Sequence, residues 1–217
     1  MGSTVLLALL TGCNNAEDTA TIATLPPAPE VAPAEPALRR LTGAQYENAV
    51  TTLFGEGLVM PGSLEPDSPI VGLLSVGAAV NSVSSYGVEL YESAAYLIAE
   101  QVTEDETFRE NFYPCEPTSA GDEECAALLI EQVGRQAWRR PLTAEELDRL
   151  TTIVTAIGES DDNFHTGAMY AISAILQSPS FLYRTEHGAL DDDGVRRLTD
   201  FETVSYTHLT LPTKCWV

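Results

Sequence analysis

Basic residues are scarce in this 217-residue sequence: 11 Lys and Arg stand against 32 Asp and Glu, for a formal net charge of −21. A negative surplus of this size opposes binding to nucleic acid and to anionic lipid headgroups, and it favours solubility. Long apolar runs are missing too, since no stretch approaches the ~20 apolar residues that a membrane-spanning helix needs. We therefore expect no nucleic-acid partner and no transmembrane helix.

Motifs that mark catalytic or cofactor sites are also absent. The sequence has no G-x-S-x-G motif, no glycine-rich phosphate loop and no C-x-x-C-H haem-attachment motif. Its histidines, at positions 165, 187 and 208, form no recognisable nucleophile or metal constellation. Residues 191–194 lack the alternating spacing of a calcium loop, so a solvated turn is expected there. We assign no catalytic, metal-binding or cofactor-binding residue, and whether the chain belongs to an enzyme stays open.

The N-terminus has the form of a targeting signal. A short apolar run, residues 5–10, leads into Leu-Thr-Gly-Cys at residues 10–13, which resembles the lipobox of bacterial lipoproteins. In that chemistry the thiol of the cysteine receives a diacylglyceryl group, and the peptide is cut just before it. The alternative is a chance apolar N-terminus, and no Lys or Arg precedes the run. We expect residues 1–13 to be a lipoprotein signal peptide, Cys13 to carry the lipid, and the protein to be exported and anchored to the cell envelope.

Residues 14–37 are rich in Ala, Thr, Pro and Glu. A segment of this composition buries too little apolar surface to offset its chain entropy, and its prolines favour an extended spacer. We therefore expect a disordered linker between the lipid anchor and the folded part.

The remainder predicts an all-α fold, an irregular bundle of about six helices. Thr42 with Gln45 and Thr143 with Glu146 have the spacing of capping boxes, and no run alternates as a strand would. The expected helices are 42–54, 84–102, a short one from 103, 122–140, 143–157 and 163–177. We divide them into an N-terminal module, 38–121, and a second module, 122–190.

Apolar stripes predict the buried face of each helix. The second helix is expected to bury Leu90, Ala94, Leu97 and Ile98. Gly158 is expected to end the fifth helix. The fourth and sixth helices are expected to bury Ala126, Leu129, Ile130, Val133 and Ala137, and Phe164, Ala168, Ile172, Ile175 and Leu176, respectively.

The run Trp138-Arg139-Arg140-Pro141 offers two interpretations. Two arginines beside a helix start could bind an anion, but arginines at a helix C-terminus usually satisfy free carbonyls, and Trp138 then anchors the core. We favour the second interpretation. Residues 181–183 could likewise line a pocket, although packing beneath the preceding helix is expected more often.

Cys115 and Cys125 enclose nine residues, four of them acidic. In an exported protein this pair is expected to form a disulfide. A metal site is the alternative, but no His lies near and the spacing is not C-x-x-C.

Several segments together resemble planctomycete-type surface domains of unknown function, which occur in large exported proteins. Residues 38–46 resemble the opening of DUF1587. Residues 125–183 resemble DUF1595, chiefly through Ala-Trp-Arg-Arg-Pro-Leu-Thr at 137–143 and Ser-Pro-Ser-Phe-Leu-Tyr-Arg at 178–184. Residues 197–202 resemble the first residues of DUF1592, so 191–204 are read as the start of a truncated third module.

The resemblance implies a function outside this segment. Similar proteins often continue into a haem c module, so the whole could serve extracytoplasmic electron transfer or oxidative catalysis, with the present helices as scaffold and haem in the missing C-terminal part. The alternative is a surface module that binds a polysaccharide or a partner protein without catalysis. Exposed aromatic rings at Tyr86, Tyr91, Tyr113 or Tyr183 would favour that alternative.

Residues 205–217 resemble a peptide that recurs at the ends of metagenome-derived chains, where sequencing-adaptor DNA has been translated. The segment has no helical periodicity and contains the single lysine of the chain. We interpret it as non-native and expect no helix there.

Overall fold

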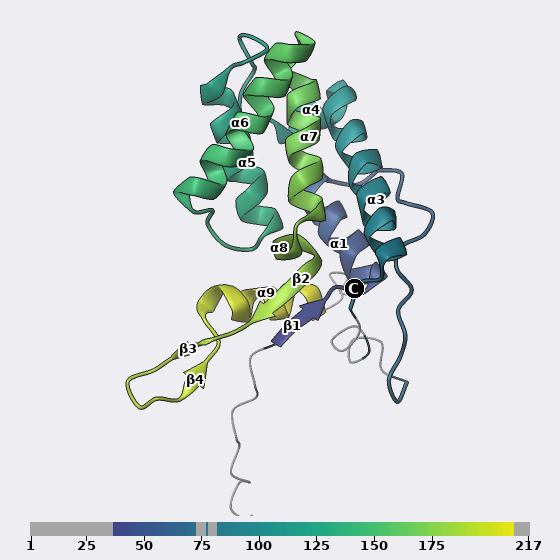
Figure 1. Cartoon of the computed structure of the whole chain (residues 1–217), viewed down its shortest axis with the longest axis vertical. Coiled ribbons are helices and arrows are strands. Elements are labelled where there is room, and N and C mark those ends of the chain that lie inside the picture. The colour runs from purple at the N-terminus through teal and green to yellow at the C-terminus, as the bar shows by residue number, and fades with distance from the viewer. Residues whose placement is uncertain (1–36, 73–76, 78–81, 211–217) are drawn as a thin grey trace, which may run out of the picture. The chain divides into compact units, whose positions relative to one another are not determined.

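The computed structural model describes residues 37–72, 77 and 82–210, the last five of them by their backbone alone. The described part contains eight helices and two two-stranded sheets (Figure 1). The helices are α1 (Gly43–Phe54), α3 (Ser85–Glu104), α4 (Glu106–Phe112), α5 (Glu123–Ala137), α6 (Ala144–Asp161), α7 (Phe164–Gln177), α8 (Pro179–Leu182) and α9 (Asp200–Thr210). The strands are β1 (Ala37–Arg40), β2 (Tyr183–Glu186), β3 (Ala189–Leu190) and β4 (Arg196–Arg197). The fold is mostly helical, as predicted.

Some predictions lie outside the described residues. These are the signal peptide with Cys13, the spacer up to residue 36, and residues 211–217. Within the described part, no helix is both long and apolar enough to cross a membrane. The division into modules at residue 121 stays a prediction.

Helix α7 lies between α3 on one side and α5 and α6 on the other (Figure 1). It suits that position because apolar side chains recur along it every three or four residues. The five side chains predicted for its inner face are all buried, as are the five predicted for α5. Both helices also begin where the sequence indicated, since Asn163 and Asp122 accept hydrogen bonds from backbone N–H groups of the first turn.

Helix α6 does not end at Gly158, which corrects that prediction. The helix continues to Asp161, and Asp162 ends it in the left-handed conformation with φ 53°. Gly158 instead lies buried within the helix, where a Cβ would collide with the carbonyl oxygen of Ala120. A Cβ on Gly167 of α7 would likewise collide with the carbonyl oxygen of Val154 in α6. These glycines allow a close approach of backbones, so they mark packing rather than a helix end.

Helix α3 buries a stripe rotated from the predicted one. Tyr91, Ala94 and Ile98 are buried, whereas Leu90 and Leu97 are only half-buried. The alanines on the buried face let α3 pack closely on α7, and Tyr91 is drawn inward by a polar partner described below. A stripe of apolar residues does not indicate a polar contact of this kind, so the sequence pattern did not place Tyr91 on the buried face.

Two short sheets were missed by the sequence analysis. Strand β1 pairs with β2 in antiparallel register, Ala37 opposite Glu186 and Arg40 opposite Tyr183. Strands β3 and β4 form a hairpin whose turn contains residues 191–194, so the expected turn is present. A pairing across about 147 positions leaves no local pattern in either segment.

The last described helix corrects another expectation. Helix α9 continues through residues 205–210, where no helix was predicted. Thr199 and Glu202 bond to each other's backbone N–H groups at its start, as in a capping box. This capping starts the helix, and its backbone then continues past Val204 despite the weak periodicity there.

Candidate functional site

The elbow between α5 and α6 carries the Trp-Arg-Arg-Pro run. Helix α5 ends at Ala137 rather than at the predicted residue 140, because Arg139 adopts a left-handed backbone conformation with φ 57°. Trp138 is 7% exposed, and its Nε1 donates to the carbonyl oxygen of Ile175 at 3.2 Å. The prediction of Trp138 as a core anchor between helices is therefore confirmed.

Arg139 points across to the end of α8. Its Nη2 donates to the carbonyl oxygens of Phe181 at 2.8 Å, Tyr183 at 3.2 Å and Ser180 at 3.3 Å. The arginine thus satisfies free carbonyls, as expected, but those of another helix instead of its own. Burial, together with the nearby charge of Arg184, lowers the pKa of the Arg139 guanidinium to about 10. It stays charged at neutral pH, and no carboxylate among the described residues pairs with it.

Arg140 is held differently. Its two terminal nitrogens donate to the two carboxylate oxygens of Glu146, both at 2.8 Å, and its guanidinium lies over the Trp138 ring. Hydrogen bonds from Arg140, followed by those from Thr143, lower the pKa of the Glu146 carboxyl to about 2. Glu146 also completes the predicted capping box with Thr143. This two-bond ion pair, which we call the Arg140–Glu146 fork, therefore fixes the start of α6 and neutralises the charge of Arg140.

A cavity of about 540 Å³ opens beside this elbow, between α1, the end of α5 and α9. Arg135, Arg139 and Arg140 line it, against one acidic residue, Asp200. The rest of its wall is mainly apolar: Ala49, Leu53, Ala137, Phe181, Phe201 and Val204. Sequence reasoning missed this cavity, because its walls come from residues up to 157 positions apart and α9 was not expected.

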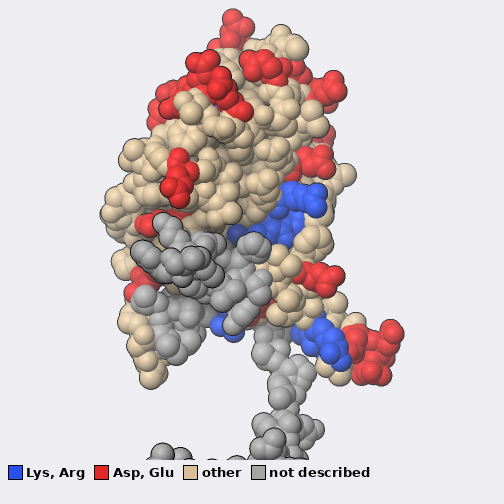
Figure 2. All heavy atoms as spheres, turned by 180° about the vertical axis from the view of Figure 1, so that it is seen from behind, with Lys and Arg blue, Asp and Glu red and all other residues tan. Residues whose placement is uncertain are grey.

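The cavity is a basic site in an acidic protein. Figure 2 shows Lys and Arg side chains gathered in the middle and lower part of one face, whereas the charged side chains seen in the upper part are carboxylates. Arg135 is exposed, and no hydrogen bond or ion pair of its own is found in the described part of the chain. Three arginines around one apolar hollow contrast with a chain of net charge −21.

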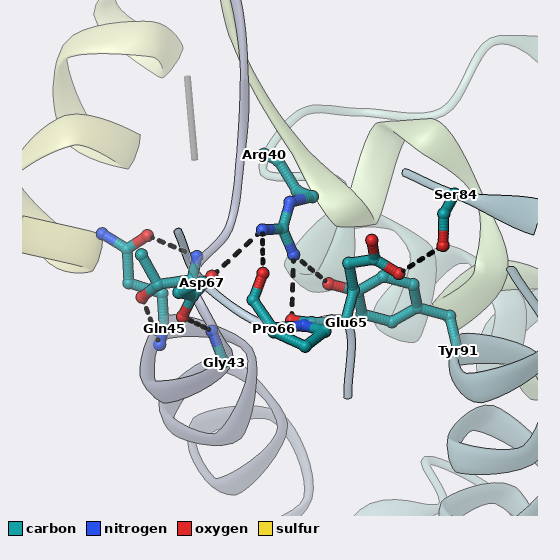
Figure 3. Close-up of polar contacts among 9 residues, drawn as sticks. Arg40, Gly43, Gln45, Glu65, Pro66, Asp67, Ser84 and Tyr91 are labelled. Atoms are coloured by element: carbon teal, nitrogen blue, oxygen red, sulfur yellow. Dashed lines mark hydrogen bonds and ion pairs between the residues drawn. The ribbon is translucent and has the colours of Figure 1, made fainter. Parts of the chain in front are cut away.

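Arg40, which is buried, lies at the junction of β1 and α1 (Figure 3). Its guanidinium donates to the hydroxyl of Tyr91 at 2.9 Å and to Asp67 Oδ1 at 3.1 Å, and more weakly to the carbonyls of Glu65 and Pro66. The other oxygen of Asp67 accepts from the N–H of Gly43 at 2.8 Å. Arg40 therefore fixes the 65–67 loop against the start of α1.

Glu186 pairs with two further arginines at the same end of the fold. It accepts from Arg39 at 2.6 Å and from Arg184 at 2.8 Å. Arg184 lies close enough to Arg139 for its charge to affect the pKa there. Among the arginines around the sheet and cavity, Arg39, Arg40, Arg140 and Arg184 have carboxylate partners, which leaves Arg135 and Arg139 without one in the described part.

The predicted disulfide is present. Cys115 and Cys125 are bonded, with their Cα atoms 5.7 Å apart. The bond joins the segment after α4 to the first turn of α5, where Cys125 is buried. Cys13, the predicted lipid-attachment residue, lies outside the described residues.

The remaining candidates are dispersed. Tyr86 is exposed, Tyr91 is buried, and Tyr113 and Tyr183 are half-buried. His165 lies beside Tyr113, with 3.3 Å between Nδ1 and the hydroxyl oxygen, and burial lowers the pKa of its imidazole. Over the described ranges, no three His, Cys, Asp or Glu side chains are placed to hold a metal ion.

Comparison with protein families gives two matches. Residues 39–104 match the model described as a protein of unknown function (DUF1587), and residues 125–186 match the model described as a protein of unknown function (DUF1595). No curated protein and no solved structure is significantly similar to the chain. The cavity takes walls from both matched segments, through α1 and the end of α5. The first segment is therefore similar to DUF1587 and the second to DUF1595, and neither description names an activity.

Proposed function

We propose that the chain is the tethered helical part of an exported lipoprotein, and that its described residues act as a scaffold rather than as a catalyst. The observation that carries this proposal is the Cys115–Cys125 disulfide. Disulfides persist in oxidising compartments and are rare in the reducing cytosol of most organisms. The lipobox-like residues 10–13 support the same compartment from independent sequence evidence.

The disulfide has a structural role that suits this setting. It closes a loop with a sequence separation of 10 residues, and Cys125 packs within the main core. In the chain-entropy model a loop of this size stabilises the fold by ~2.5–3 kcal/mol. Quantitative alkylation of both thiols in unreduced, denatured protein would contradict the bond in solution.

Lipid attachment is tested by metabolic labelling with an alkyne fatty acid in a bacterial host. The native chain and a Cys215→Ser control should both take up label and fractionate with membranes. The Cys13→Ser variant should do neither, because the thiol that accepts the diacylglyceryl group is gone. Equal labelling of Cys13→Ser and the native chain would refute the proposed anchor.

Under this proposal the redox chemistry takes place in another part of the protein, and the described residues only support it. In the proteins that this chain resembles, a haem c module often accompanies these domains, and the 217 residues contain no C-x-x-C-H motif. The purified chain should therefore show no Soret absorbance, whereas the full gene should encode at least one such motif. A native stop codon near Val204, with no haem motif in the locus, would overturn this assignment.

A surface binding module is the second candidate. Tyr86 is 65% exposed, and Tyr96 and Tyr170 form an exposed edge-to-face pair with ring centroids 5.9 Å apart. Aromatic faces of this kind can stack on sugar rings. Retardation of the protein in polysaccharide-containing gels, lost in Tyr86→Ala and in Tyr96→Ala, would support this candidate. Unchanged mobility of the native chain in every polysaccharide would remove it.

A further inference from the structure

We infer that the cavity between α1, α5 and α9 binds a single-chain amphiphile with a terminal carboxylate. The apolar chain of the ligand occupies the hollow, and its carboxylate lies against Arg139 and Arg135. This inference is independent of the scaffold and of the lipid anchor proposed above.

The cavity has the size and lining of a ligand site. Its volume of about 540 Å³ lies within the ~300–1,000 Å³ usual for small-molecule pockets. Phe201 and Val204 of α9 are 51% and 54% exposed, so large apolar side chains on its wall remain in contact with solvent. Burying that surface against an alkyl chain contributes roughly 25 cal/mol per Å².

The guanidinium of Arg139 is only partly used by the protein. All three of its hydrogen bonds come from Nη2, and Nε and Nη1 have no hydrogen-bond partner in the described part of the chain. Neither nitrogen is among the fully buried unpartnered atoms there, so both keep solvent-accessible surface. Arg139 also lines the cavity, and we therefore place the acceptor for these donors inside it. Because Cδ lies on the same side of the guanidinium as Nη1, Nε and Nη1 do not face one carboxylate together, and each offers a single charge-assisted hydrogen bond to a carboxylate oxygen.

The charge around the cavity favours a ligand with a single anionic group. Arg140 is already neutralised by Glu146, which leaves Arg135 and Arg139 as the available cations, with Asp200 opposing them. A polyanion would meet the strongly acidic remainder of the chain, whereas one carboxylate would meet only this local positive field. The apolar walls argue against a sugar, which would lose its hydrogen bonds to water there.

The direct test is calorimetric titration of the full chain with dodecanoate, below its micelle concentration, and with methyl dodecanoate. Dodecanoate should bind saturably at one site. The ester should bind about tenfold more weakly, because it lacks the charge that the arginines recognise. Absence of saturable dodecanoate binding, or equal affinities for acid and ester, would overturn the inference.

Matched variants locate the site. Arg135→Gln and Phe201→Ala should each weaken dodecanoate binding by about fivefold, through loss of charge and of apolar contact respectively. The controls Arg149→Gln and Tyr86→Ala change an exposed arginine and an exposed ring that do not line the cavity, and should bind as the native chain does. All four positions are exposed, so circular dichroism should show native folding. Equal affinity in variants and controls would refute the assigned cavity.

Vesicles distinguish a free fatty acid from a membrane lipid as the source of the ligand. The Cys13→Ser chain, which lacks the proposed lipid anchor, should not co-sediment with phosphatidylcholine or phosphatidylglycerol vesicles lacking free fatty acid, and its net charge opposes the anionic phosphatidylglycerol surface. Vesicles doped with dodecanoate should lose that ligand to the protein. Stable binding to undoped phosphatidylglycerol vesicles, with no affinity for dodecanoate, would contradict the inference.

Discussion

Two arginines at one end of the fold, buried Arg40 and half-buried Arg139, are held in opposite ways. Arg40, 3% exposed, meets a carboxylate, a tyrosine hydroxyl and two carbonyls supplied by the 65–67 loop and α3. Arg139 meets three carbonyls, all through one nitrogen, and has no carboxylate partner in the part of the chain that the structure describes. The first site neutralises its charge, and the second leaves a positive charge beside an apolar cavity.

The difference separates a structural site from a recognition site. Arg40 links three segments, and the ion pair with Asp67 leaves little for a ligand to gain. Arg139 keeps a left-handed backbone that a residue with a Cβ adopts at a cost of about 1–2 kcal/mol. Within the described residues its charge is balanced by carbonyl dipoles and by the Phe181 ring, whose centroid lies 5.8 Å from Cζ. An external carboxylate would supply the partner that the described part of the chain does not provide at Arg139.

The largest effect is expected at the structural site. Replacing Asp67 by Ala removes the counter-charge of buried Arg40 and a hydrogen bond to the start of α1, so unfolding free energy should fall by about 3–5 kcal/mol. Urea denaturation measures the loss. Asp161→Ala, at an exposed position without a hydrogen bond or ion pair in the described part, should change stability by no more than ~0.5 kcal/mol. Similar losses in both variants would show that Arg40 does not depend on Asp67.

How far the sequence predicted these sites depends on the range of the contacts. The faces of α5 and α7 and the two capping boxes follow from residues a few positions apart, and all were predicted correctly. The β1–β2 pairing and the partners of Arg139 depend on residues more than 40 positions away, and no local pattern encodes them. Gly158 is a third case. Glycine often ends a helix, but this one lies within α6 and allows close packing.

Replacing Arg139 should lower the unfolding free energy by an intermediate amount, and two replacements should differ in how much they lower it. Arg139→Ala leaves three carbonyls without their donor, so stability should fall by about 1–3 kcal/mol. Arg139→Gly loses the same donor but adopts φ 57° without a Cβ penalty, so it should be about 1 kcal/mol more stable than the alanine variant. Urea denaturation of both variants measures the difference. Equal stabilities would mean that the left-handed backbone carries no strain.

The smallest effect is expected at the Arg140–Glu146 fork, and it depends on pH. The folded-state pKa of Glu146, about 2, lies below its ordinary value of 4.5, so its contribution is fully present above pH 4.5 and is lost as the pH falls through about 2. Because the pair is partly exposed, Glu146→Gln should destabilise by only about 1 kcal/mol at pH 7.

Acid-dependent urea curves test this. The difference between the native chain and Glu146→Gln should shrink between pH 4.5 and 2. The neighbouring control, Glu145→Gln, is exposed and has no ion pair in the described part, so it should show little pH-dependent difference. A Glu146→Gln difference that stays constant down to pH 2 would show that the carboxylate charge does not stabilise the elbow.

The contrast between Arg40 and Arg139 is tested most directly by following their Nε–Hε signals by NMR while dodecanoate is added. Arg139→Lys assigns one signal, and Arg40 serves as the internal reference. The account predicts that the Arg139 signal shifts saturably as the carboxylate binds, whereas the Arg40 signal stays in place because its guanidinium is already enclosed. An Arg139 signal that does not respond, or equal shifts of both signals, would contradict it.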